Sequence, residues 1–109
     1  MAVTTRSVTD VCVAARAAAR RLAALDSATK DRALHAIADA LEERAAEIVE
    51  ANERDMEAGR EAGLSAALLD RLMLDEARVG AIAAQVRDIA ALRDPVGEVI
   101  EGFRLPNGL

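Results

Sequence analysis

The amino-acid sequence predicts a mainly α-helical fold of four helices, followed by the first strand of a hairpin near the C-terminus. Alanine, leucine, glutamate and arginine are abundant, and all four are strong helix formers. Apolar residues recur at steps of three and four along most of the chain, which indicates helices with one apolar face. The end of the chain differs, because Asn107-Gly108 is typical of a tight hairpin turn in which both residues take a positive φ.

The first helix is expected over residues 7–25. Arg16, Arg20 and Arg21 fall largely off its apolar stripe, as in a helix with one solvent-facing side. The stripe consists of Val8, Val11, Cys12, Ala15, Ala18, Leu22 and Leu25.

The second helix begins near Ser27 and Thr29, whose side-chain oxygens suit an N-cap. The apolar pattern predicts that it continues to about Ala58, with a bend near Arg44. Gly63 is expected just beyond the helix end, in the left-handed conformation that glycine adopts without strain. The stripe consists of Leu34, Ile37, Ala38, Leu41, Ala45, Ile48 and Val49.

Two further helices follow. A short one comes after Ser65, with an apolar side of leucines, and a long one comes after Asp75, which suits an N-cap. Pro95 ends the long helix, because the residue before a proline is pushed out of the helical region. The apolar residues are Leu68, Leu69 and Leu72 in the short helix and Val79, Ile82, Ala83, Val86, Ile89 and Leu92 in the long one.

Residues 97–105 are predicted to form the strand that enters the Asn107-Gly108 turn. Only Leu109 follows the turn, so the strand would be an unpaired edge that exposes Ile100 and Phe103. Intact proteins avoid such edges because they promote aggregation. We therefore expect the 109 residues to be the front part of a longer protein.

Composition excludes several classes of function. The balance of 14 basic and 19 acidic residues gives a net charge of −5, which argues against nucleic-acid binding. No apolar run approaches the ~20 residues that span a bilayer. The single cysteine cannot form an internal disulfide, so a reducing, cytoplasmic location is expected. With one aromatic residue the core would be marginal alone, which suggests a further partner surface.

No side chain presents an obvious site. Cys12 lies on the apolar stripe and is interpreted as a small buried residue rather than a reactive thiol. His35 has no second histidine or cysteine at ligand spacing, so neither a metal site nor acid–base catalysis is predicted. The segment from Gly59 to Gly63 lacks the spacing of a phosphate-binding loop. The sequence thus offers no catalytic, cofactor-binding or metal-ligating residue.

Three stretches together resemble one family. They are residues 51–55 (ANERD), 62–72 (AGLSAALLDRL) and 94–99 (DPVGEV), preceded by a weaker match at residues 32–41 (RALHAIADAL). In this order and spacing they resemble γ-glutamyl phosphate reductase, also called glutamate-5-semialdehyde dehydrogenase. Leu68 stands where the family pattern has methionine, which is a minor departure.

The resemblance implies an α/β aldehyde dehydrogenase-like parent fold and a homo-oligomer. It also implies NADPH-dependent reduction of L-glutamyl 5-phosphate to L-glutamate 5-semialdehyde, in proline biosynthesis, through a cysteine thioester. The family's nucleophile and cofactor residues lie beyond Leu109, and Cys12 does not match the nucleophile's motif. The fragment alone is therefore expected to bind no NADPH and to be inactive.

By the same resemblance, residues 1–96 would be a helical segment on the cofactor-domain side and residues 97–109 the truncated first strand of an oligomerisation arm. Asn52, Asp55, Asp70 and Arg71 lie inside the most specific motifs. We interpret them as capping and ion-pairing residues between helices rather than substrate contacts. In the same view Leu64, Leu68, Leu69 and Leu72 would cover a sheet that this chain lacks.

Two other classes of function remain to be weighed. A small helical module that dimerises through its alanine and leucine faces fits the four stripes but not the predicted hairpin. A nucleic-acid-binding helical domain would need a basic face, and the arginines here are interleaved with acidic residues.

Overall fold

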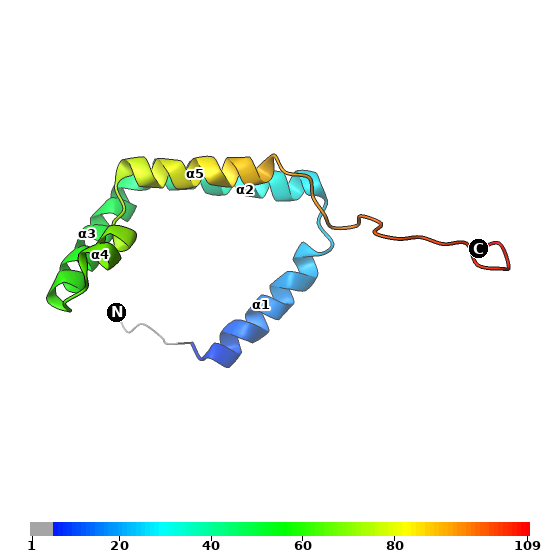
Figure 1. Cartoon of the computed structure of the whole chain (residues 1–109), viewed down its shortest axis with the longest axis horizontal. Helices are drawn as coiled ribbons and strands as arrows, with labels where there is room; N and C mark the ends of the chain where they lie inside the picture. The colour runs from blue at the N-terminus through cyan, green and yellow to red at the C-terminus, as the bar shows by residue number, and fades with distance from the viewer. Residues whose placement is uncertain (1–5) are drawn as a thin grey trace. The chain divides into compact units, whose positions relative to one another are not determined.

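A computed structural model of the chain describes residues 6–109 (Figure 1). Residues 27–92 form one compact unit, and the two ends of the chain belong to a second unit. Within the described residues there are helices and no strand, so the predicted helical class is confirmed. The helices are α1 (Val8–Leu22), α2 (Ser27–Glu43), α3 (Ala45–Glu61), α4 (Ala66–Leu72) and α5 (Glu76–Ala90).

Helix α1 forms within the predicted range and is capped by Ser7, but it buries no residue. The Ser7 hydroxyl accepts a hydrogen bond from the Asp10 amide at 3.1 Å, and Asp10 lies in the first turn, where the helix dipole favours negative charge. Cys12 is exposed, so the prediction that it is buried was wrong. The reason is that an apolar stripe buries its residues only where another element packs against it, and α1 is exposed along its whole length.

The main helix pair is α2 with α5. Figure 1 shows the two running side by side in opposite directions, α2 toward α3 and α5 away from it. The contact is made by small residues, because Ala38 and Ala83 have no exposed surface and Val79 has only 1%. Small side chains let helix axes approach closely, so an alanine-rich sequence can still pack to a dense interface.

Helices α3 and α4 form the second pair. A Cβ added to Gly59 in α3 would lie 3.0 Å from Leu64 Cδ1, 3.2 Å from Leu69 Cδ2 and 3.4 Å from Leu72 Cδ2, so the leucines pack directly on the α3 backbone. The helix end between them closes as predicted, because Gly63 has a φ of +76°. The Leu64 amide donates to the Gly59 carbonyl at 3.0 Å, as in a Schellman motif.

The predicted single helix to about Ala58 is instead two helices divided at Arg44. Arg44 has a φ of −105° and a ψ of 18°, outside the helical range, and α3 then runs to Glu61. The Arg44 amide still donates to the Ala40 carbonyl at 3.0 Å, and the Arg44 carbonyl accepts from the Ile48 amide at 3.1 Å. The expected bend near Arg44 is therefore present, and it is sharp enough to interrupt the helix (Figure 1).

The predicted strand over residues 97–105 does not form, although the turn after it does. The Gly108 amide donates to the Leu105 carbonyl at 2.9 Å and the Leu105 amide donates to the Leu109 carbonyl at 2.7 Å. Asn107 does not take a positive φ, whereas Gly108 has +86°. This is a three-residue hairpin loop rather than the predicted two-residue one. Residues 97–104 lack a partner segment, and an unpaired strand is not stable.

Candidate functional site

The only buried polar side chain among the described residues is Asn52 of α3, which is 6% exposed. Its Nδ2 donates to the Leu72 carbonyl at 2.8 Å, and its Oδ1 accepts from the Leu74 amide at 2.8 Å. Both ends of the carboxamide are therefore used by the segment between α4 and α5. The prediction that Asn52 connects helices is confirmed, and its amide is not free to contact a ligand.

Arg78 of α5 holds the same segment from the other side. Its guanidinium donates to the Met73 carbonyl at 3.0 Å and to the Asp70 Oδ1 at 2.8 Å, and it also contacts the Asp70 carbonyl. Asp70 is thus an ion-pairing residue, as predicted. Three helices meet at residues 70–74, which we call the junction.

A second arginine ties α5 to α2. Arg87 donates two hydrogen bonds of 2.8 Å to the carboxylate of Glu42 and one of 2.8 Å to Asp39. The hydrogen bonds that Arg87 donates lower the pKa of the Glu42 carboxyl below its ordinary value. The same bonds, accepted by Glu42 and Asp39, raise the pKa of Arg87. A bidentate contact of this kind fixes the register of the two helices. It adds little stability, because solvent screens the exposed charges.

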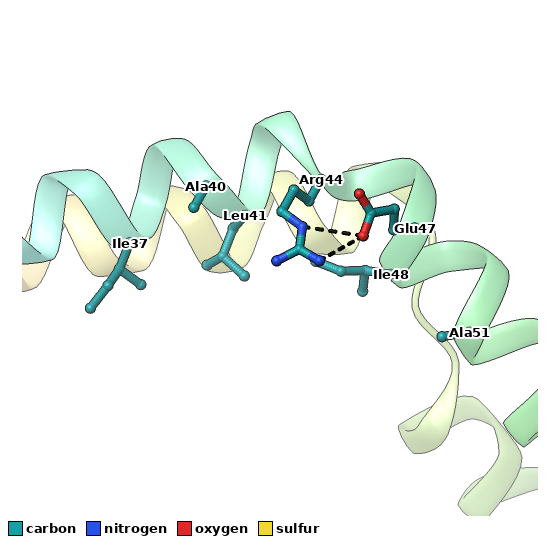
Figure 2. A pocket seen from close by; sticks show the side chains of 7 residues that line it. All are labelled: Ile37, Ala40, Leu41, Arg44, Glu47, Ile48 and Ala51. Atoms are coloured by element: carbon teal, nitrogen blue, oxygen red, sulfur yellow. Dashed lines mark hydrogen bonds and ion pairs between the residues drawn. The ribbon is translucent and has the colours of Figure 1, made fainter. Parts of the chain in front are cut away.

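An open apolar surface lies on the inner side of the bend between α2 and α3 (Figure 2). It is a shallow groove of about 480 Å³, to which both helices contribute. Ile37 is 51% exposed although it is large and apolar. The lining residues, which we call the elbow groove, are Ile37, Ala40, Leu41, Arg44, Glu47, Ile48 and Ala51.

One ion pair crosses the elbow groove. Arg44 donates to the Glu47 carboxylate through Nη2 at 2.7 Å and Nε at 3.2 Å (Figure 2). This hydrogen bond lowers the pKa of Glu47 and raises that of Arg44. A surface that is apolar except for one internally neutralised pair suits contact with another protein segment, because no charge is left to desolvate alone.

The remaining sequence candidates do not converge on a site. Asp55 and Arg71 are exposed on α3 and α4. Cys12 and His35 are exposed as well. Within residues 6–109, no group of three or more His, Cys, Asp or Glu side chains is placed to hold a metal ion.

Sequence reasoning missed the elbow groove and the two arginines. In the sequence alone, Arg78 and Arg87 look like ordinary surface charges. The ion-pair partner of Arg78 lies 8 residues away, and those of Arg87 lie 45 or more residues away. Leu64, Leu69 and Leu72, which were expected to cover a missing sheet, are instead partly used against Gly59. Leu64 and Leu68 are still 38% and 49% exposed.

The described helices, α1 to α5, include none with the length and hydropathy needed to cross a bilayer.

Comparison with known proteins agrees with the motif reading. The chain is 54% identical over 95 residues to the γ-glutamyl phosphate reductase of Clostridium novyi, and 55% identical over 103 residues to that of Kineococcus radiotolerans. These matches cover 87% and 94% of the chain but 23% and 24% of the relatives, so the chain spans about a quarter of their length. No protein-family model and no solved structure matches. The resemblance stated from the motifs is confirmed.

Proposed function

We propose that the chain is the N-terminal part of an NADPH-dependent reductase that converts L-glutamyl 5-phosphate to L-glutamate 5-semialdehyde in proline biosynthesis. The observation that carries the proposal is the 55% identity over 103 residues to a protein named γ-glutamyl phosphate reductase. The three motifs at residues 51–55, 62–72 and 94–99 agree with it, since each contains a residue with a structural role. Asn52 and Asp70 form hydrogen bonds between elements, and Gly63 and Gly97 take a positive φ.

In this proposal the chain's own role is architectural. Asn52, Arg78 and Arg87 hold the helices in one arrangement, and the elbow groove offers an apolar surface to the remaining three quarters of the enzyme. The chain alone binds no NADPH and has no activity, because the residues for hydride transfer and for the nucleophile lie elsewhere. Residues 1–96 would be the helical segment and 97–109 the start of an arm in a cytoplasmic homo-oligomer that contacts neither membrane nor nucleic acid.

The experiment is a chimera. The segment of the Clostridium novyi reductase that matches this chain is replaced by residues 1–109, and formation of NADPH is followed with L-glutamate 5-semialdehyde, phosphate and NADP. We expect activity from the chimera and none from either part alone. A chimera that folds and oligomerises but shows no activity would contradict the proposal, as would NADPH binding by the isolated chain.

The second candidate is a self-contained helical module that dimerises. The exposed stripe of α1 favours it, since a fully exposed apolar face is commonly covered by a partner. The two candidates differ in oligomeric state: the module predicts a stable dimer of the isolated chain, whereas the reductase proposal predicts none without the rest of the enzyme.

A further inference from the structure

The bend at Arg44 has no cause in the local sequence. Residues 41–47 read LEERAAE, all of them strong helix formers, with no proline, glycine or serine. Sharp helix breaks almost always occur at proline, at glycine or serine, or where another group enters the hydrogen-bond ladder. A sparsely populated backbone conformation persists only when the surrounding structure holds it, so the bend must be imposed by packing.

The junction is the structure that can impose it. Helix α5 packs on α2, and α4 packs on α3, so each arm of the bend carries its own partner. Only Met73–Asp75 connects α4 to α5. While α4 stays packed on α3 and α5 on α2, this short connection keeps α3 from moving away from α2. Asn52 fixes this connection to α3 through its two hydrogen bonds.

The elbow groove depends on the same bend. Its lining residues follow one another at steps of three and four, so on a straight helix they would form a flat stripe. The bend at Arg44 places the side chains of Ile37, Leu41 and Ile48 along its inner side, so the stripe becomes a concave surface lined from both helices (Figure 2).

We propose that Asn52 is the latch of a two-state elbow. While its amide holds the Leu72 carbonyl and the Leu74 amide, α2 and α3 stay bent and the elbow groove exists. When the latch is released, α4 separates from α3, residues 27–61 join into one straight helix, and the groove becomes a flat stripe. The consequence for assembly with the rest of a reductase depends on the proposed function, whereas the latch itself does not.

The test measures the bend in the full chain. Spin labels are placed on cysteines at two exposed positions, Ala33 in α2 and Glu57 in α3, in a Cys12→Ser background, and their separation is measured by pulsed electron spin resonance. A continuous helix would set them about 36 Å apart along its axis, from a rise of 1.5 Å per residue. We expect a clearly shorter distance in the native chain and a shift toward the straight-helix value in Asn52→Ala.

Two further variants make every outcome informative. Asp55→Ala, on the same helix and exposed, is the matched control and should keep the native distance. Asn52→Asp keeps the oxygen that accepts from Leu74 but loses the donor to Leu72, so it should give an intermediate shift. Its distances decide the question if circular dichroism shows that Asn52→Ala unfolds. A native distance in the folded Asn52 variants, or an equal shift in Asp55→Ala, would overturn the latch.

Discussion

At the scale of single residues, two glycines in helix interiors should respond oppositely to alanine. A Cβ at Gly80 in α5 meets nothing within 4 Å, so Gly80→Ala should gain the helix preference of alanine, about 0.5–1 kcal/mol. A Cβ at Gly59 in α3 meets three leucine methyl groups at 3.0–3.4 Å. Overpacking costs about 1–3 kcal/mol, which outweighs the same gain, so Gly59→Ala should destabilise the chain.

Urea unfolding followed by circular dichroism compares the two variants directly. The midpoint should rise for Gly80→Ala and fall for Gly59→Ala. If both midpoints rise, the leucines of α4 have moved aside without cost, and the close α3–α4 packing is not the constraint inferred here.

Cys12 offers a second test at this scale. Because it is exposed on α1, its thiol should react fully with a disulfide reagent in the native chain, without denaturant. Cys12→Ser should change the free energy of unfolding by less than about 0.5 kcal/mol, as surface substitutions usually do. Slow reaction that becomes fast only in urea would mean that α1 is covered.

At the scale of elements, the Arg87 contact between α2 and α5 should make stability depend on pH. The pKa of Glu42 is lower in the folded chain than its ordinary value of 4.5. Its contact with Arg87 therefore contributes fully above that value and is lost as the pH falls through the folded pKa. Glu42→Gln should lower the urea midpoint at pH 7, and its difference from the wild type should shrink as the pH falls through the lowered pKa of Glu42 and the carboxylate becomes protonated.

Asp39 provides the comparison for this prediction, because it shares Arg87 through one hydrogen bond rather than two. Asp39→Asn should show a smaller effect at pH 7. A difference between Glu42→Gln and the wild type that does not change as the pH falls from 7 into the acidic range would show that the carboxylate charge is not the source of the stability.

The elements that could be predicted from sequence are those whose ends are set locally. Asp75 was predicted as an N-cap, and its side chain accepts from the Arg78 amide at 2.7 Å; the short helix predicted after Ser65 is likewise capped, because the Ser65 hydroxyl accepts from the Leu68 amide at 3.3 Å. The break at Arg44 was predicted only as a bend, since no local residue causes it. The prediction of a strand over residues 97–105 was wrong because a strand needs a second segment to pair with. The turn at Gly108 forms without providing one.

The candidate site was less predictable than the fold for a related reason. Asn52 was singled out by its motif, and its role followed from one side chain. The elbow groove, in contrast, arises from which residues are left uncovered after α2 has packed on α5 and α3 on α4. Periodicity marks Ile37, Leu41 and Ile48 as apolar in the same way as Ala38, and only tertiary packing decides that Ala38 is buried while Ile37 is 51% exposed.

At the scale of the whole molecule, the exposed apolar surface is the property that most needs a partner. Large apolar residues are exposed on α1, α2 and α5 and on residues 96–109, including Ile100 and Phe103 at 101% and 80%. A chain with so much uncovered apolar surface buries little per residue and is marginal alone. The chain spans about a quarter of the length of the relatives it matches, and in the proposed enzyme the other three quarters would cover this surface.

The groove can be tested within the chimera by a matched pair of charges. Ala36 and Ala40 are both exposed alanines on α2, but only Ala40 lines the elbow groove. Glutamate has good helix preference, so neither Ala36→Glu nor Ala40→Glu should change the folded chain itself. If the rest of the enzyme covers the groove, Ala40→Glu buries an unpaired carboxylate at about 3 kcal/mol, roughly a hundredfold loss of the assembled form.

The measurement is the fraction of chimera that elutes at the native oligomer size, together with its NADPH formation. Ala36→Glu should behave as the parent chimera, because Ala36 does not line the elbow groove. Equal losses in both variants would place the covered surface elsewhere on α2, and no loss in either would leave the groove open in the assembled enzyme. Only a loss confined to Ala40→Glu agrees with an elbow groove that the rest of the enzyme covers. In that case the bend at Arg44, which forms the groove, would matter for assembly of the enzyme.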